Sequence, residues 1–312
     1  MFKSLSMFPA AAQTPLQQVV LPILETKKVE WYVKRLDLIH PLLSGNKYYK
    51  LKHTIVHAQN KGAKRLLTFG GAFSNHIYAA AAAAHLAGLE IVGCIRGEVD
   101  EPLNPTLRAA SEMGMALFPM ARSTYRQKST SWVLEMLRER FGDFYLIPEG
   151  GTNGLAILGC QEILSDSDRT FDTVCASIGT GGTLAGILAA AAPKQRVLGF
   201  SSLKGQFVLK DFEALLLEHQ LEPLGQWEIF TDYHCGGYAK HNATLLKVMR
   251  DFNRATGIPL DPIYTGKMVM GILDLLEKDY FPPGSRILMI HSGGLQGIAG
   301  FEWRWNQRLY PD

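Results

Sequence analysis

Short apolar runs rich in β-branched residues recur along this chain, and most are followed by glycine and then by a segment with helical periodicity. The runs that indicate strands are Arg65–Phe69, Ile91–Ile95, Phe144–Ile147, Val174–Ile178, Val197–Phe200 and Ile287–Ile290. The segments that indicate helices are Tyr48–Lys61, Asn75–Ala87, Thr130–Phe141, Asn153–Ser165, Thr183–Ala192, Ala239–Ala255 and Lys267–Leu276. Strands that alternate with helices predict parallel sheets flanked by helices, which is an α/β fold.

The length of 312 residues predicts two domains, because a single hydrophobic core rarely grows beyond about 250 residues. No repeat or flexible linker divides the chain, and the two strand–helix series meet near residues 150–160. The 32 Lys and Arg residues and 29 Asp and Glu residues are spread evenly, which argues against nucleic acid as a partner.

Polar residues interrupt the most apolar stretch, Ile77–Ile95, so we expect no membrane span. The N-terminus lacks the long apolar core of a signal peptide, and we therefore expect cytoplasmic residence. Cysteines stand at 94, 160, 175 and 235 without CxxC spacing. Buried free thiols are the favoured interpretation, and no metal site is expected.

A glycine-rich loop, Gly179-Thr180-Gly181-Gly182-Thr183, follows one predicted strand and opens a predicted helix. Its backbone N–H groups would converge on an anion. A dinucleotide fingerprint would need Gly or Ala where Leu184 stands, and no Gly-Lys-Ser/Thr sequence forms a nucleoside-triphosphate loop. The loop therefore favours a phosphate of mononucleotide size, held by amides and the hydroxyls of Thr180 and Thr183. A tight turn without a ligand is the alternative.

A second turn places Ser74, Asn75 and His76 at the start of an alanine-rich helix. The simplest interpretation of Ser74 is a helix N-cap. Several polar side chains crowd this first turn, where the positive end of the helix favours a carboxylate. A small carboxylate ligand is thus a candidate for this site.

Lys47 lies in a polar Gly45-Asn46-Lys47 turn, where an isolated lysine would ordinarily be a surface residue. Together with the two glycine-containing turns, however, this motif resembles the pyridoxal-phosphate enzymes of the tryptophan synthase β-like fold (fold type II). The sequence is most similar to the 1-aminocyclopropane-1-carboxylate deaminase and D-cysteine desulfhydrase family. The resemblance spans about residues 30–300 and continues through these segments: Pro148–Asn153, Gly236–Tyr238, Leu260–Lys267 and Ile290–Gly294.

The resemblance implies a role for each matching residue. Lys47 would bind the aldehyde of pyridoxal 5'-phosphate covalently and act as the base, supported by Asn46. The implied cofactor contacts are Asn75 at the phenolic oxygen, Ser292 at the pyridine nitrogen, and the loop of Gly179, Thr180, Gly181, Gly182 and Thr183 at the phosphate. The implied substrate contacts are Ser74, Asn75, His76, Thr265 and the tyrosines Tyr238 and Tyr264, with Ser74 and Tyr264 as alternative bases.

Two positions favour the desulfhydrase branch, because deaminases carry Glu where Thr265 stands and Leu where Ser292 stands. The implied reaction is α,β-elimination of a small D-amino acid to a 2-oxo acid, ammonia and sulfide by a lyase. The alternatives are deamination of 1-aminocyclopropane-1-carboxylate to 2-oxobutyrate, and a phosphate-ligand binding protein without turnover. Tyr49, Phe73 and Tyr78 replace polar residues of the family and make the expected pocket more aromatic.

The resemblance also implies the domain organisation. Residues 1–47 and 157–312 would form a larger cofactor-binding domain, and residues 48–156 a smaller α/β domain. The cofactor would lie between them, in a protein that is expected to form a homodimer.

Overall fold

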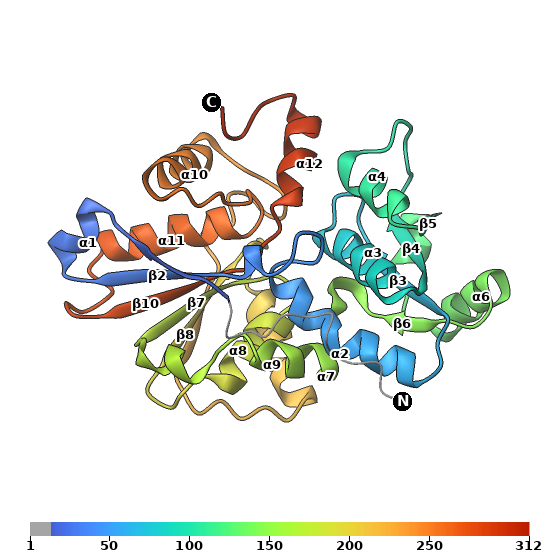
Figure 1. Cartoon of the computed structure of the whole chain (residues 1–312), viewed down its shortest axis with the longest axis horizontal. Coiled ribbons are helices and arrows are strands. Elements are labelled where there is room, and N and C mark those ends of the chain that lie inside the picture. The colour runs from blue at the N-terminus through green and yellow to red at the C-terminus, as the bar shows by residue number, and fades with distance from the viewer. Residues whose placement is uncertain (1–13, 312) are drawn as a thin grey trace.

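The computed structural model describes residues 14–311, which form two sheets with helices packed against their faces (Figure 1). The larger sheet has the order β1-β2-β10-β7-β8-β9, and the smaller has the order β5-β4-β3-β6. The strands of the larger sheet are β1 (Leu16–Val19), β2 (Glu30–Arg35), β7 (Thr173–Ile178), β8 (Arg196–Ser201), β9 (Trp227–Phe230) and β10 (Arg286–His291). Those of the smaller sheet are β3 (Arg65–Gly70), β4 (Glu90–Arg96), β5 (Met115–Met120) and β6 (Tyr145–Ile147). Pairings between these strands are all parallel within the described chain except that of β1 with β2.

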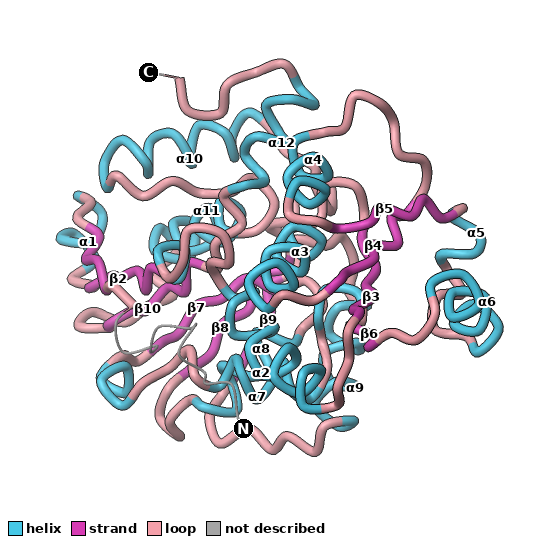
Figure 2. Tube along the Cα trace, turned by 45° about the vertical axis from the view of Figure 1, so that its right-hand side comes forward, coloured by secondary structure: helices cyan, strands magenta, loops and turns pink. Residues whose placement is uncertain are grey.

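The helices are α1 (Pro22–Lys27), α2 (Asn46–Asn60), α3 (Asn75–Ala87), α4 (Pro105–Glu112), α5 (Arg122–Tyr125), α6 (Ser131–Phe141), α7 (Gly154–Gln161), α8 (Gly182–Ala190), α9 (Phe207–Glu218), α10 (Ala243–Thr256), α11 (Thr265–Glu277) and α12 (Gln296–Trp305). Short 3₁₀ turns cover Leu36–Leu38, Glu149–Gly151 and Asp166–Thr170. Helix α2 packs against α7 and α8 on one side and against α3 on the other (Figure 2). This helix cluster joins the two sheets.

The parallel α/β architecture expected from the sequence is confirmed. Each predicted strand is present, with ends that differ from the prediction by one residue at most. The strands that the sequence did not indicate are β1, β2, β5 and β9, and three of these lie at sheet edges. Strand β5 contains Pro119, and proline within an apolar run argues against a central strand. The edge position accommodates Pro119, because one side of β5 makes no ladder.

Helix α10 begins at Ala243, later than the predicted start at Ala239. The side chain of Asn242 accepts a hydrogen bond from the Leu245 backbone N–H at 2.9 Å and caps the helix. Residues 232–241 instead form a loop that carries Tyr238 to the cavity described below. The helix end is thus set by a cap and not by the apolar periodicity.

Helix α3 is buried on nearly all sides, because its central residues are the alanines 79–84. A helix that is apolar all round belongs in a protein interior. Small side chains let α3 pack closely against β3, β4, α2 and α4. Its first turn, which carries Asn75, is thereby fixed at the ends of the strands.

The strands of the larger sheet come from residues 16–35 and 173–291, and those of the smaller from residues 65–147. The domain boundaries at 47/48 and 156/157 stay a prediction, and residues 1–13 of the larger predicted domain lie outside the described residues. Among residues 14–311, no helix is both long enough and apolar enough to cross a membrane.

Candidate active site

A cavity of about 610 Å³ opens where β3, β7 and β10 end. In open parallel sheets, ligands bind at these carboxyl ends of the strands. The sequence-predicted residues that line the cavity are Asn46, Lys47, Ser74, Asn75, His76, Gly179, Thr180, Gly181, Thr183, Tyr238, Tyr264 and Ser292. Gly182 and Thr265 do not line it. The cavity is therefore lined by segments that lie far apart in the sequence.

Lys47 lies in the first turn of α2, and its Nζ donates a hydrogen bond to the Gly150 carbonyl at 3.0 Å. Burial lowers the pKa of Lys47 to about 8. Gly45 brings this turn close to Ser292, because a Cβ on Gly45 would lie 2.1 Å from the Ser292 carbonyl oxygen. The Asn46 backbone N–H donates to the same oxygen at 3.1 Å. Lys47 is thus held at a fixed place with an amine that is partly neutral near pH 7.

Lys50 also lines the cavity, although the sequence did not indicate it. It is buried, and its Nζ donates to the Gly150 carbonyl at 2.6 Å and to the Thr152 hydroxyl at 2.7 Å. Burial and the neighbouring Lys47 hold the pKa of Lys50 well below its ordinary value. Residues three apart share one face of a helix, so the spacing of Lys47 and Lys50 was the available signal.

The glycine loop lines the cavity at the N-terminus of α8. Asn46 Nδ2 donates to the Thr183 hydroxyl at 2.7 Å, which orients that hydroxyl in the cavity. The hydroxyls of Thr180 and Thr152 are hydrogen-bonded at 2.6 Å, and the amine of Lys50 lies 3.4 Å from Thr180. A helix N-terminus, hydroxyl donors and a buried lysine favour a phosphate.

The start of α3 is a capped helix end that also forms part of the cavity wall. The Ser74 hydroxyl accepts hydrogen bonds from the His76 and Ile77 backbone N–H groups, so Ser74 is an N-cap that also faces the cavity. The Asn75 side-chain oxygen accepts a hydrogen bond from Gln296 Nε2 at 2.9 Å. Gln296 lines the cavity as well and was not identified from the sequence.

His76 is buried beside the same turn. Its Nε2 lies 2.7 Å from the Thr68 hydroxyl. Burial and the two nearby lysines hold the pKa of His76 well below its ordinary value. The imidazole is therefore neutral at physiological pH.

Tyr238 and Tyr264 meet edge to face, with ring centroids 6.2 Å apart, and their hydroxyls are hydrogen-bonded to each other. Burial raises the pKa of both phenols. Asp261 fixes the second ring, because its carboxylate accepts a hydrogen bond from the Tyr264 backbone N–H at 2.8 Å. Both hydroxyls stay protonated at physiological pH and can act as hydrogen-bond donors.

Thr265, which we expected to contact the substrate, is fully buried away from the cavity. Its hydroxyl donates to the Asp261 carboxylate at 2.7 Å and accepts from the Asp261 backbone N–H at 2.8 Å. Thr265 therefore supports the turn that carries Tyr264.

The three aromatic residues that replace polar residues of the family pattern do not all reach the cavity. Phe73 and Tyr78 line the cavity. Tyr49 does not line it, and its ring packs in the core against Tyr48 with centroids 5.1 Å apart. Only the first two residues can alter the lining of the site.

These residues fit pyridoxal 5'-phosphate. Lys47 provides an amine of lowered pKa, which can join an aldehyde, and Lys50 with the loop of Thr180 and Thr183 would hold the phosphate. Asn75 and Ser292 add further polar residues to the lining of the cavity.

Comparison with known proteins agrees with this fit. The model of the pyridoxal-phosphate dependent enzyme family matches residues 7–293. A Pyrococcus horikoshii protein named "Putative 1-aminocyclopropane-1-carboxylate deaminase" is 30% identical, with 95% of each chain covered. The mitochondrial bifunctional D-cysteine desulfhydrase/1-aminocyclopropane-1-carboxylate deaminase of Arabidopsis thaliana is 29% identical, over 91% of this chain and 77% of that protein.

Among solved structures, an ACC deaminase homologue is similar with a TM-score of 0.80 and 28% identity, covering 93% of this chain and 92% of that one. The resemblance noted in the sequence is thereby confirmed, as are the fold class and pyridoxal phosphate as the cofactor. The chain belongs to the family of pyridoxal-phosphate dependent enzymes.

Proposed function

We propose that the protein is a lyase that catalyses α,β-elimination of D-cysteine to pyruvate, ammonia and sulfide. The observation that carries this proposal is the Lys47 amine, whose pKa is lowered to about 8 and which faces the same cavity as an anion site. Relatives named as D-cysteine desulfhydrases support the substrate, including one from Serratia proteamaculans that is 27% identical over 87% of this chain.

Pyridoxal phosphate, when bound, supplies an aldehyde that joins amines and a ring that accepts electron density from the Cα of an amino acid. Lys47 is the residue placed to join that aldehyde, and Lys50, Thr180 and Thr183 would hold the phosphate. Asn75 and Ser292 would contact the ring.

The lowered pKa of Lys47 also suits proton transfer. With an ordinary pKa near 10.5, a lysine is almost entirely protonated at pH 7, and lowering its pKa to about 8 raises the neutral share about a hundredfold or more. The neutral amine can remove the Cα proton of the substrate. Lys47 is therefore the preferred base over Ser74, whose hydroxyl already accepts backbone hydrogen bonds.

The paired phenols would assist the leaving group. Because burial raises the pKa of Tyr238 and Tyr264, each keeps its proton and can donate a hydrogen bond to a departing thiolate. After the Cβ–S bond breaks, the enamine product is hydrolysed by one water to pyruvate and ammonium.

The second candidate is deamination of 1-aminocyclopropane-1-carboxylate, which the names of the relatives also support. Thr265 does not reach the cavity, so it no longer helps to distinguish a desulfhydrase from a deaminase. That distinction now rests on Ser292 alone. A homodimeric state and cytoplasmic residence remain predictions.

A keto-acid assay tests the proposal. The purified protein loaded with pyridoxal phosphate should release pyruvate from D-cysteine faster than from L-cysteine, and faster than it releases 2-oxobutyrate from 1-aminocyclopropane-1-carboxylate. Faster release from the cyclopropane would favour the second candidate. Absence of keto acid from all three, with cofactor bound, would favour a binding protein without turnover.

Lys47→Ala should abolish turnover and leave the cofactor bound without a covalent link, because the variant lacks the amine that joins the aldehyde. Borohydride reduction of the loaded protein followed by peptide mapping gives the site of attachment. Lys50→Ala is the matched variant, since this lysine lies one turn along the same helix. It should weaken cofactor binding and keep the label on Lys47. A label on Lys50 would contradict the assignment.

A further inference from the structure

Gln296 is the first residue of α12 and forms a hydrogen bond with the first residue of α3. Its side-chain Nε2 donates to the Asn75 side-chain oxygen at 2.9 Å, across 221 residues of sequence. Helix α12 follows strand β10 of the larger sheet, and α3 follows β3 of the smaller sheet. Both residues line the active-site cavity. This hydrogen bond therefore joins the two parts of the molecule at the wall of the cavity.

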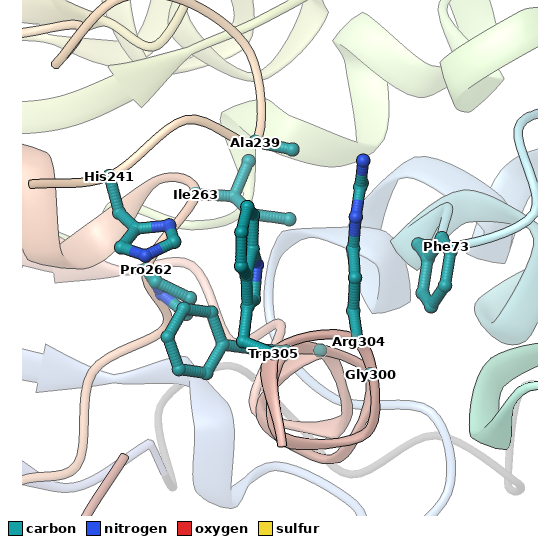
Figure 3. Close-up of a pocket in the computed structure, with 10 residues that line it drawn as sticks. Phe73, Ala239, His241, Pro262, Ile263, Gly300, Arg304 and Trp305 are labelled. Atoms are coloured by element: carbon teal, nitrogen blue, oxygen red, sulfur yellow. The ribbon is translucent and has the colours of Figure 1, made fainter. Parts of the chain in front are cut away.

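Helix α12 is held against the turn that precedes α3. A Cβ on Gly300 would lie 3.0 Å from the Phe73 ring. The Phe73 ring also lies near Trp303, with ring centroids 6.0 Å apart, and the Arg304 guanidinium lies 5.8 Å from its centre. Figure 3 shows Arg304 projecting from α12 beside Phe73. Because Phe73 stands two residues before Asn75, these contacts hold the start of α3 close to α12.

Asn75 has an amide side chain, which carries an acceptor oxygen and a donor NH₂ group. Gln296 occupies the oxygen. The NH₂ group lies against the loop after β10, where a Cβ on Gly294 would lie 2.6 Å from Asn75 Nδ2. Gly294 lines the cavity, and the NH₂ group donates to no other residue of the described chain. A hydrogen-bond donor is thus left for a ligand in the cavity.

We propose that Gln296 is a positioning residue that turns the Asn75 amide so that its NH₂ group donates to the ionised phenolic oxygen of pyridoxal phosphate. The inference rests on the proposed contact between Asn75 and that oxygen, and it adds the group that orients Asn75. An ionised oxygen only accepts hydrogen bonds, and these are about twice as strong as hydrogen bonds between neutral groups. If the amide turned over, its own oxygen would face the phenolic oxygen and repel it. With Nε2 of Gln296 on the Asn75 oxygen, the amide is held in the arrangement that the cofactor needs.

Two substitutions at position 296 change what the side chain can donate. Gln296→Met has a similar length and no hydrogen-bond donor, so Asn75 loses its partner. Gln296→Glu has nearly the same shape but can only accept when ionised, so its carboxylate would draw the NH₂ group of Asn75 away from the cofactor. Gln59→Met is the matched control, because Gln59 Nε2 donates at 3.3 Å to the carbonyl of Ala87, the last residue of α3. The control thus removes a glutamine donor from the opposite end of the same helix.

The test measures the dissociation constants of pyridoxal phosphate and 3-deoxypyridoxal phosphate with cofactor-free protein. The second compound lacks the phenolic oxygen and keeps the aldehyde and the phosphate. Gln296→Met should weaken binding of pyridoxal phosphate about tenfold, because a hydrogen bond to a charged group is lost. Gln296→Glu should weaken it further, and neither variant should change binding of the deoxy compound. Gln59→Met should change neither constant. Equal weakening for both compounds, or unchanged binding of pyridoxal phosphate in either variant at 296, would overturn the proposal.

The absorption spectrum of the bound cofactor gives a second readout. A hydrogen bond to the phenolic oxygen favours its ionised form, which absorbs at longer wavelength than the neutral phenol. Both variants at 296 should therefore raise the share of the band at shorter wavelength at a given pH, and Gln59→Met should not. A general loss of stability would lower the amount of bound cofactor and leave the ratio of the two bands unchanged. An unchanged ratio in both variants at 296 would contradict the proposal.

Asn75→Ala separates this inference from the contact on which it rests. That variant should weaken binding of pyridoxal phosphate and leave the deoxy compound unchanged. Adding Gln296→Met to it should cause no further loss, because Gln296 acts through Asn75. If Asn75→Ala affects both compounds equally, the contact with the phenolic oxygen is wrong and the inference fails with it. If Asn75→Ala weakens only pyridoxal phosphate but the double variant loses more, the contact stands and the role of Gln296 is wrong. None of these measurements depends on which amino acid the enzyme converts, so they are independent of the proposed elimination.

Discussion

The amines of Lys47 and Lys50 both donate hydrogen bonds to the Gly150 carbonyl oxygen, at 3.0 Å and 2.6 Å respectively. Two buried ammonium groups at this separation would repel each other, and burial disfavours the charge of each. Both pKa values are accordingly lowered. A phosphate near Lys50 would favour its charged form, whereas Lys47 can react as a neutral amine. One turn of helix would thus provide both the nucleophile and a ligand for the phosphate.

The rate of covalent cofactor capture should follow the titration of Lys47. Only the neutral amine attacks an aldehyde, so the rate should rise with pH and level off above a midpoint near pH 8, where the pKa of Lys47 lies. Stopped-flow absorbance of cofactor-free protein mixed with pyridoxal phosphate gives this profile. A midpoint near 10.5, the ordinary value, would show that burial does not set the reactivity.

Thr265→Val should affect stability more than substrate choice. The variant leaves the Asp261 carboxylate without one hydrogen bond in the interior, which costs about 1.5–3 kcal/mol of the free energy of unfolding. Denaturant titration measures this loss. Thr54→Val is the control, because the buried Thr54 hydroxyl only donates to a carbonyl of its own helix. A tenfold change in the rate ratio of D-cysteine to 1-aminocyclopropane-1-carboxylate would instead indicate contact between Thr265 and substrate.

At the scale of elements, the turn Glu149–Gly151 connects the smaller sheet to the anion site. It follows β6, and its Gly150 carbonyl accepts from both lysines of α2. Gly150 has a φ of 70°, and a Cβ there would lie 2.8 Å from the Thr180 side chain. The close approach of this turn to the loop before α8 therefore requires glycine.

Gly150→Ala should weaken cofactor binding about tenfold or more, because the added methyl group displaces Thr180 and the carbonyl between the lysines. Gly62→Ala is a matched control, since Gly62 has a φ of 71° but no atom within 4 Å of the place that its added methyl group would take. Both variants carry the same backbone strain, so a comparison of cofactor dissociation constants isolates the steric effect. Equal weakening in both would show that the effect is one of stability alone.

At the scale of the whole molecule, the cavity is lined by residues of α3, which packs on the smaller sheet, and of α8, which packs on the larger sheet. A ligand in the cavity would therefore contact both parts of the molecule. Helix α12 strengthens this junction, because it packs against α4 and because Gln296 donates to Asn75. Ligand binding should therefore stabilise the molecule as a whole.

Pyridoxal phosphate at a hundredfold excess over its dissociation constant should stabilise the folded state by about 2.7 kcal/mol, seen as a raised melting temperature of the cofactor-free protein. Pyridoxal without the phosphate is the control and should stabilise much less, because it leaves Lys50 and the α8 N-terminus without an anion. Equal shifts with both compounds would mean that the loop from Gly179 to Thr183 does not bind the phosphate.

Local sequence patterns indicated the glycine loop, the strands β3, β4, β6, β7, β8 and β10, and the helices α2, α3, α6, α7, α8, α10 and α11. An apolar run, a glycine turn and a helical period depend on residues that are neighbours in the chain, so β7 and α8 are readable from sequence to within one or two residues. The resemblance then supplied the order of motifs and the cofactor. Strand β5 was not indicated, because Pro119 within its apolar run argues against a central strand.

Tertiary structure decided which side chains share the cavity. Asn75 and Gln296 are 221 residues apart, and Lys50 reaches Gly150 across 100 residues. Thr265 stands next to Tyr264 in the chain, yet its side chain points into the core, because consecutive residues at a helix start face different directions. Such contacts depend on the order of the strands in the two sheets and on how α2, α8 and α12 pack between them. No local pattern contains that information, and so Lys50 and Gln296 emerged only from the folded chain.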